Sequence, residues 1–526
     1  MKNNQERTNS LANIAAFYLF FSVVVVLLLI CIWVVFKKGF FIGLIALLLL
    51  CIFVYIAWHR FGIINIFKDD VKTGFIHDVY QNQYFLRQFL RPYKITNEML
   101  LKPIFLGMIK VGNNLKSLNL LPEVFHKNHV AIIGASGSGK SKIAALILVQ
   151  LYKIGNSIIV FDPKNDEFLA RVLNFCAKLL GREIVYVDLN DKRPQINPFY
   201  GTDSDDAEEI LQAGLLLDPS GNPAVDFYRG EDRDACESLI RTGKTNIVDL
   251  IEAGSQIEEV TDRVNFWREL KMLGRVSAFH TNRGIDLSKE IARGSIIYIV
   301  GSTDNIRVVA AQRLLLARVF QIIKKRNIKS RRQVCIFLDE FKYSISNCVM
   351  RALGTIRDKK CNLIIAYQGT NDLYDSGGLD PRAVIGAAEG NTTLKFVYKL
   401  EDTETAKEFV LKAGKERIFV ETKSKILDGG LDSGSWREGD HDAVSIDLLT
   451  VNMPKPMSGE ASVCWVFGQG PAFPLSTMHL TPGDEPKIKV AKPVRPLNND
   501  LLNAQSSIGF NIGVSLNNNS SRQEFI

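Results

Sequence analysis

The fold is decided by residues 129–152, HVAIIGASGSGKSKIAALILVQLY. Residues 134–141 fit the pattern G-x-x-x-x-G-K-[ST] at every fixed position, after a strand-like apolar run and before a run with helical apolar spacing. Glycines in such a loop let main-chain N–H groups curl around nucleotide phosphates. Lys140 is expected to reach the β- and γ-phosphates, and the Ser141 hydroxyl to ligate Mg²⁺. The predicted phosphate-binding residues are Gly134, Ala135, Ser136, Gly137, Ser138, Gly139, Lys140 and Ser141.

A second stretch, VCIFLDEF at residues 334–341, supplies the carboxylates that such a site needs. Its five apolar residues predict a buried strand, so that Asp339 emerges at the carboxyl end of the strand, where it can hold Mg²⁺. Glu340 is placed to polarise the water that attacks the γ-phosphate. Because a glutamate directly follows the aspartate, we expect the nucleotide to be ATP rather than GTP.

Short runs rich in β-branched residues alternate with helical segments along much of the chain. This alternation predicts parallel strands covered on both faces, and therefore an α/β fold class with a RecA-like P-loop NTPase domain. The predicted strands are residues 129–133, 157–161, 183–187, 295–300, 334–338 and 362–367. Gln368 directly follows the last of them, where a polar residue can sense the γ-phosphate, contact a neighbouring subunit or cap the strand.

Residues 202–289 interrupt this alternation with helical patterns alone, which predicts an inserted all-α domain. The segment has 18 acidic and 10 basic side chains, a net charge of −8, so that the rest of the chain, whose total is +8, carries +16. A DNA-binding insertion is not expected to be so acidic. We therefore expect the insertion to bind a basic protein partner.

Other segments of biased composition have plainer interpretations. The basic run KKRNIKSRR, residues 324–332, is either a solvated helix end or a contact for DNA or acidic lipid. The Pro- and Asn-rich residues after 481 predict a flexible tail. Eight scattered cysteines without a C-x-x-C pair argue against a disulfide framework and a structural zinc site, and the lack of an H-E-x-x-H motif argues against a zinc hydrolase.

Two apolar runs near the amino terminus predict a membrane anchor. Residues 14–36 and 39–58 contain no charged side chain, and each is long enough to cross a hydrocarbon core about 30 Å thick as a helix. The alternative is a buried hydrophobic hairpin in a soluble protein. Basic residues flank both spans, so charge alone does not set the orientation. Because ATP is cytoplasmic, we expect both the amino terminus and the ATPase domain to be cytoplasmic.

In their order, these features resemble the coupling proteins of bacterial conjugation and type IV secretion, the TraG/TraD family. The resemblance covers roughly residues 14–480, although the loop between the two membrane spans is unusually short. Its motifs, beside the membrane hairpin, are HVAIIGASGSGKS (129–141), FDPKNDEF (161–168), INPF (196–199), IFLDEF (336–341), RDKKCNLIIAYQG (357–369) and NTTLKFVYKLEDTETAKEF (391–409). Asp162, Lys164 and Asn197 match positions in these motifs.

The resemblance implies a bacterial inner-membrane ATPase that forms a homo-hexameric ring and uses ATP and Mg²⁺. Such a ring would move relaxase-bound, single-stranded DNA toward a type IV secretion channel, with relaxosome proteins and channel components as partners. It also implies a role for Arg357, which precedes Gln368 by eleven residues, as the arginine that completes the site of a neighbouring subunit. The alternative is a surface arginine at the end of a basic helix.

The domain organisation follows from these segments. The predicted parts are a transmembrane hairpin (1–60), a membrane-proximal segment (61–125), a RecA-like domain (126–201 and 290–480), an all-α insertion (202–289) and a tail (481–526). Two other functions stay open. One is a DNA-segregation translocase of the FtsK type, against which we note that no winged-helix pattern follows the core. The other is an ATP-binding adaptor that docks substrates without moving them; stimulation of ATP hydrolysis by DNA would separate it from a motor.

Overall fold

The computed structural model describes residues 83–101, 103–111, 114–327, 332–374, 378–424, 433–457 and 459–481. The predicted membrane spans and the predicted tail beyond residue 481 lie outside these residues. Within the described ranges, no helix is both long and apolar enough to cross a membrane.

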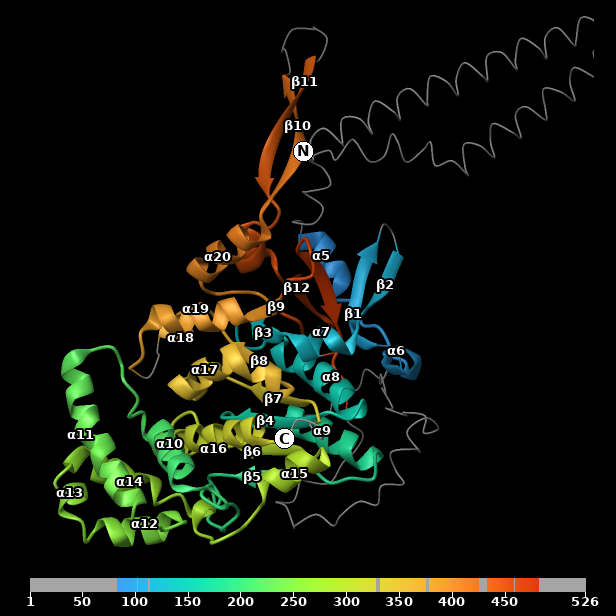
Figure 1. The fold of residues 1–526 in the computed structure, drawn as a ribbon. Helices are drawn as coiled ribbons and strands as arrows, with labels where there is room; N and C mark the ends of the chain where they lie inside the picture. The colour runs from blue at the N-terminus through green and yellow to red at the C-terminus, as the bar shows by residue number, and fades with distance from the viewer. Residues whose placement is uncertain are drawn as a thin grey trace, which may run out of the picture. The chain divides into compact units, whose positions relative to one another are not determined.

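The centre of the fold is an 11-stranded mixed sheet in the order β2-β1-β13-β12-β9-β3-β8-β7-β4-β6-β5, as far as the described residues show (Figure 1). The strands from β9 to β5 in this order run parallel. Their bounds are β3 (His129–Ile133), β4 (Ser157–Asp162), β5 (Val185–Asp188), β6 (Ile296–Val300), β7 (Val334–Leu338), β8 (Cys361–Tyr367) and β9 (Thr392–Val397). The six predicted strands are therefore all present, and those at 129–133 and 334–338 agree to the residue.

An antiparallel extension on the β9 side of the sheet was not predicted. β12 (Ser462–Phe467) pairs with β9, β13 (Phe473–Thr477) with β12, β1 (Ile104–Val111) with β13, and β2 (Asn114–Leu120) with β1. β1 and β2 belong to the segment 61–125 that the sequence set apart as membrane-proximal. Gly107 lies at an irregularity in β1 with a φ of +149°, and a Cβ there would lie 2.0 Å from the Ser476 carbonyl oxygen. Only glycine therefore fits at this position, where β1 passes close to the main chain of β13.

Helices cover both faces of the parallel strands, because side chains of each strand alternate between two apolar cores. Val130 and Ile132 of β3 face the core under α8 and α9, whereas Ala131 and Ile133 face the core under α16 and α17. Figure 1 shows these two layers on opposite sides of the sheet. The bounds are α8 (Lys140–Lys153), α9 (Glu167–Leu179), α16 (Ile306–Lys325), α17 (Asn347–Thr355), α19 (Pro381–Asn391) and α20 (Thr403–Ala413).

The insertion between β5 and β6 is built from helices that pack on the α16 side of the sheet (Figure 1). Its elements are α10 (Ser204–Leu215), α11 (Pro223–Ile240), α12 (Ile247–Gly254), α13 (Glu258–Thr261), α14 (Val264–Leu273), η1 (Ser277–Phe279) and α15 (Leu287–Arg293). Asn197, of the INPF motif, is buried where the chain enters this insertion. Its amide donates to the carbonyl oxygens of Thr245 at 2.8 Å and Asn282 at 2.9 Å, and its own oxygen accepts from Phe199 N–H. Asn197 therefore ties the entry of the insertion to its interior and its exit.

The remaining described elements are short. They are α5 (Gln83–Phe89), α6 (Asn97–Leu101), α7 (Pro122–Lys127), α18 (Asn371–Tyr374), η2 (Phe341–Ser344), η3 (Ile356–Lys359) and η4 (Leu448–Asn452). Among the described residues, β10 (Lys415–Ser424) and β11 (Ser433–Asp442) pair with each other in a separate two-stranded sheet.

Candidate nucleotide-binding site

The predicted site residues meet because four adjacent strands end at the same edge of the sheet. β3, β8, β7 and β4 are parallel neighbours, so their carboxyl ends lie side by side. Open α/β sheets bind ligands at this edge. The P-loop follows β3, Gln368 follows β8, Asp339 and Glu340 follow β7, and Asp162 ends β4.

The P-loop joins β3 to α8 and is held against neighbouring strands by its main chain. Gly134 N–H donates to the Tyr367 carbonyl oxygen at 3.2 Å, and Ala135 N–H donates to the Lys399 carbonyl oxygen at 2.8 Å. Lys140 begins α8 and is buried, with its ammonium donating to the carbonyl oxygens of Gly134 at 2.5 Å and Ala135 at 3.2 Å. Burial lowers the pKa of Lys140 below its ordinary value. The lysine therefore curls back over its own loop.

The loop fits a nucleotide phosphate chain. Gly134, Gly137 and Gly139 have φ angles of +152°, +73° and +114°, and a Cβ at Gly134 or Gly139 would lie 2.6 Å or 2.5 Å from the nearest side-chain atom. Ser138 Oγ is buried and finds no hydrogen-bond partner within the described residues. The loop, Lys164, Asp339 and Glu340 line a cavity of about 500 Å³, a volume in the range of small-molecule sites.

Asp339 and Glu340 stand at the end of β7 with different surroundings. Burial, helped by the negative charges of Asp162 and Glu340, raises the pKa of Asp339 to about 7. A divalent cation held by Asp339 and the Ser141 hydroxyl would favour the ionised carboxylate, so these two residues fit Mg²⁺ bound together with phosphate. Glu340 is 2% exposed and has a left-handed backbone with a φ of +43°. That conformation costs a non-glycine residue roughly 1–2 kcal/mol, and it is the kind of strain found at functional sites.

Gln368 lies beside the predicted catalytic glutamate. Its amide Nε2 is 3.4 Å from Glu340 Oε2, and its main-chain N–H donates to the Asp372 carboxylate at 2.8 Å. The structure therefore places Gln368 in contact with Glu340, and its role at the nucleotide, at a neighbouring subunit or as a strand cap stays a prediction.

One residue at the site, Lys164, was noted in the sequence only as a match to a family motif. Its ammonium forms an ion pair with Glu340. The two residues are 176 positions apart, so no local pattern could indicate this contact. The only signal was the position of Lys164 just after a predicted strand, in the motif FDPKNDEF. Phe168 and His479 also line the cavity and were not predicted.

Arg357 lies at the opposite edge of the sheet from the P-loop of its own chain. It belongs to η3, just before the amino end of β8, and it is close enough to His129 at the start of β3 for its charge to act there. Burial, with the positive charge of Arg357, lowers the pKa of His129 to about 4. The seven residues of β8 separate the two edges by about 20 Å. Within one chain, the structure does not bring Arg357 to the nucleotide site.

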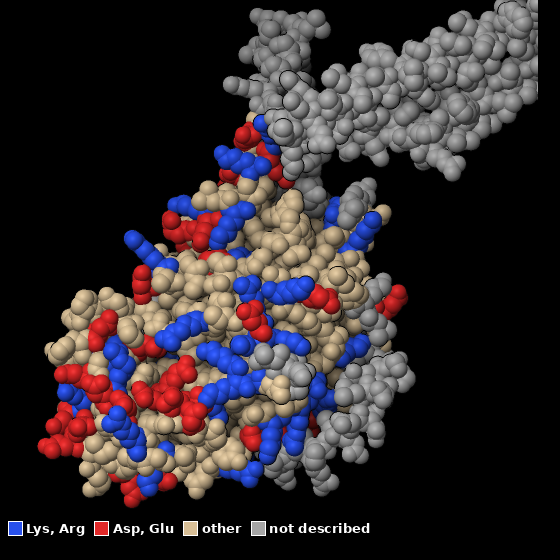
Figure 2. Space-filling view, in the orientation of Figure 1, with Lys and Arg blue, Asp and Glu red and all other residues tan. Residues whose placement is uncertain are grey.

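The described residues of the basic run, 324–327 at the end of α16 and Arg332 before β7, also lie toward the edge of the sheet where the strands begin. Figure 2 shows Lys and Arg side chains in a band across the middle of this view, with acidic side chains more frequent toward the insertion. Two described members of the run have partners in the chain: Arg332 donates to the Gly155 carbonyl oxygen at 2.7 Å, and Lys325 pairs with Asp203 and Asp206.

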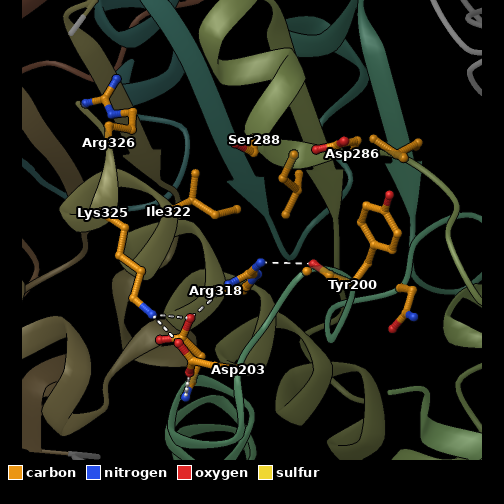
Figure 3. Close-up of a pocket in the computed structure, with 13 residues that line it drawn as sticks. Tyr200, Asp203, Asp286, Ser288, Arg318, Ile322, Lys325 and Arg326 are labelled. Carbon is orange, nitrogen blue, oxygen red and sulfur yellow. Dashed lines mark hydrogen bonds and ion pairs between the residues drawn. The ribbon is translucent and has the colours of Figure 1, made fainter. Parts of the chain in front are cut away.

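A second cavity, of about 490 Å³, lies between the start of the insertion, α15 and the end of α16 (Figure 3). Lys325 reaches from α16 to Asp203 at 2.9 Å and to Asp206 at 2.6 Å. Arg318 donates to the Tyr200 carbonyl oxygen at 2.9 Å. The basic side chains of this cavity are thus paired with groups of the chain itself. This pairing favours a structural role, in which the cavity residues hold the insertion against the core.

Comparisons with known proteins agree with this fold. Residues 105–199 match the family model described as "Helicase HerA, central domain", which takes in β1, β2, the P-loop, β4 and β5. Mobilization protein A of Escherichia coli is 26% identical over 332 residues, which cover 61% of this chain and 60% of that protein. The DNA double-strand break repair helicase HerA of Sulfolobus acidocaldarius is 25% identical over 127 residues, 23% of this chain and 21% of that protein. The chain thus spans about three fifths of the length of the first of these relatives.

Among solved structures, the bacterial conjugative coupling protein TrwBdeltaN70 aligns with 76% of this chain and 97% of its own, with a TM-score of 0.54 and 12% identity. Plasmid coupling protein TrwB in complex with ADP and Mg²⁺ aligns over 76% of this chain and 96% of its own, with a TM-score of 0.53 and 13% identity. The chain therefore has a mixed α/β fold similar to that of TrwB, which confirms the predicted α/β, RecA-like part of the fold class.

Proposed function

We propose that this protein is an ATPase of bacterial conjugation that couples relaxase-bound DNA to a type IV secretion channel. The observation that carries the ATPase part is the meeting of Lys140, Asp339 and Glu340 at one edge of the sheet, around the cavity of the P-loop. TrwB, which has this fold, has been crystallised with ADP and Mg²⁺. Mg²⁺ would be held by Ser141 and Asp339, and it would neutralise charge on the phosphates.

Each residue of the site has a separate role in ATP hydrolysis. Main-chain N–H groups of the P-loop and the Lys140 ammonium hold the phosphates of ATP. The Glu340 carboxylate accepts a proton from the attacking water and orients it, as a buried carboxylate beside the phosphates can do. Gln368, in contact with Glu340, keeps that carboxylate in place. The arginine that would stabilise the developing charge would come from another copy of the chain.

The transport part of the proposal rests on motif order and on similarity. The fold aligns with nearly the full length of the TrwBdeltaN70 chain, and the matched relative from Escherichia coli is a mobilization protein. Two apolar runs that suit a membrane hairpin precede the ATPase core. We accordingly propose a homo-hexameric ring, anchored in the inner membrane with both its amino terminus and its ATPase domain cytoplasmic. Its substrate is single-stranded DNA bound to a relaxase.

Stimulation of ATP hydrolysis by DNA tests this function. With the full-length protein in detergent, single-stranded DNA is expected to raise the ATPase rate severalfold, because a motor must couple turnover to its track. Lys140→Ala protein serves as the blank for contaminating ATPases. A rate that does not change with DNA would favour the ATP-binding adaptor over the motor.

The insertion is expected to recognise relaxosome proteins through a surface that combines acidic and aromatic side chains. Its net charge is −8. On α11, Phe227 and Tyr228 are 65% and 68% exposed and contact each other edge to face, with ring centroids 5.6 Å apart. Aromatic residues are enriched at protein interfaces and often dominate their binding energy, so we propose this pair as part of the recognition surface.

Replacing both aromatic residues with alanine should weaken binding of the cognate basic relaxosome protein about tenfold or more. Val248→Ala, at a 45% exposed position on α12, serves as a control that should leave the affinity unchanged. Affinities measured at two salt concentrations should also show that binding weakens with salt. If the double variant instead lost affinity for naked DNA and kept the protein partner, the insertion would be a DNA-binding domain.

A further inference from the structure

Lys164 is a second lysine in the P-loop cavity, and its position is set by a buried carboxylate. Asp162, 1% exposed, accepts hydrogen bonds from Lys164 N–H at 3.0 Å, Asp166 N–H at 2.6 Å and the Tyr298 hydroxyl at 2.6 Å. Tyr298 in turn stacks on Tyr186, with ring centroids 5.8 Å apart. The turn that carries Lys164 is therefore rigidly fixed to the end of β4.

The side chain of Lys164 leaves this turn toward Glu340. The ammonium pairs with one oxygen of the glutamate, while Gln368 Nε2 lies 3.4 Å from the other. Glu340 is 2% exposed, whereas Lys164 keeps 40% of its side chain exposed, and both line the cavity beside Lys140. A lysine ammonium has three N–H donors, so Lys164 can hold the carboxylate and still donate to an anion in the cavity.

We propose that Lys164 binds the terminal phosphate of the nucleoside triphosphate and positions Glu340 against it. This inference rests on the proposed ATPase function and adds a residue that distinguishes a nucleoside triphosphate from a diphosphate. Lys140 reaches from the loop after β3, and Lys164 reaches from the turn after β4, across the end of β7. One ammonium thus ties the water-activating carboxylate to the phosphate that the water attacks. Diphosphate lacks the group that Lys164 contacts.

The test compares the affinities for a triphosphate and a diphosphate in a Glu340→Gln background. Removing Lys164 alone would leave Glu340 as an unpaired buried charge and could disturb folding. This problem is avoided by comparing the single variant Glu340→Gln with the double variant Lys164→Met/Glu340→Gln, because neither protein has that carboxylate. Binding of the non-hydrolysable analogue AMP-PNP and of ADP, both with MgCl₂, is measured by isothermal titration calorimetry on full-length protein.

Glu340→Gln protein is expected to bind AMP-PNP more tightly than ADP. Lys164→Met/Glu340→Gln should bind ADP as before and lose about tenfold to hundredfold in its affinity for AMP-PNP, the effect of one charge-assisted hydrogen bond. Lys164→Arg/Glu340→Gln should restore part of the preference. Arg171→Ala/Glu340→Gln, which removes an exposed cation of α9 that pairs with Glu167, is the matched control and should keep the full preference.

The outcomes separate this inference from the proposed function. If the lysine variant kept the full preference for AMP-PNP, Lys164 would not contact the terminal phosphate, and the ATPase function would still stand. If Glu340→Gln protein bound neither nucleotide, the proposed function itself would be wrong, and this inference with it.

Discussion

Arg357→Ala protein is expected to bind ATP with near-normal affinity and to hydrolyse it about 10³- to 10⁵-fold more slowly than the unaltered protein. The Lys140 ammonium and Mg²⁺ leave charge on the γ-phosphate oxygens incompletely neutralised as the bond breaks. A planar guanidinium suits two of these oxygens and stays charged. Because Arg357 lies at the edge of the sheet opposite its own P-loop, any such contact must be made to another subunit. Turnover is measured with saturating ATP and DNA.

Mixing experiments test whether Arg357 acts between subunits. Rings that contain both Arg357→Ala and Lys140→Ala chains have some interfaces with an intact P-loop and an intact arginine, so mixing should restore part of the activity. Electron microscopy of differently tagged chains verifies that mixed rings form. Arg351→Ala is the matched control, because Arg351 is on the preceding helix and pairs with Asp218 at 3.0 Å. Near-normal turnover by Arg357→Ala protein, or no rescue in verified mixed rings, would make Arg357 an ordinary surface residue.

Lys140→Ala and Glu340→Gln are expected to abolish hydrolysis in different ways. Lys140→Ala removes a buried cation from the phosphate site, so nucleotide affinity should fall about tenfold to hundredfold together with turnover. Glu340→Gln removes the carboxylate that accepts a proton from water but leaves the P-loop and Lys140 intact, so turnover should fall about 10²- to 10⁴-fold while ATP stays bound. Equilibrium binding and steady-state hydrolysis, measured on the same preparations, separate the two effects.

Lys407→Ala is a suitable control for these variants, because Lys407 is exposed on α20 and pairs with Glu404. It should change neither affinity nor turnover. Hydrolysis by Glu340→Gln protein at the rate of the unaltered protein would remove Glu340 from its assigned role.

Much of the parallel core could be predicted from sequence because its strands are buried on both faces. Such strands are continuous apolar runs, and the runs at 129–133 and 334–338 have the same bounds in the structure. The antiparallel strands gave weaker signals. β2, with the sequence NLKSLNL, is partly exposed along its length, and its polar residues are typical of a loop. Its partner β1 is interrupted by Gly107.

The candidate site was predictable where its functional residues directly follow a buried strand in the sequence. Lys140, Asp339 and Glu340 each come just after a recognisable buried strand, and parallel strands bring such positions to one edge. The pairing of Lys164 with Glu340 was not predictable, because it depends on β4 being the neighbour of β7 in the sheet. Strand order is set by the packing of the whole domain, and local sequence does not report it.

Movement of DNA is the most direct test of the proposed motor. A single-stranded DNA carries biotin at one end, bound by streptavidin, and is incubated with the full-length protein and excess free biotin. With ATP the protein is expected to displace streptavidin, whereas Glu340→Gln protein with ATP, or the unaltered protein with AMP-PNP, should leave it in place. ATP hydrolysis without displacement of streptavidin, whether the biotin is on the 5′ or the 3′ end of the DNA, would contradict the account and make the protein an ATP-using docking platform.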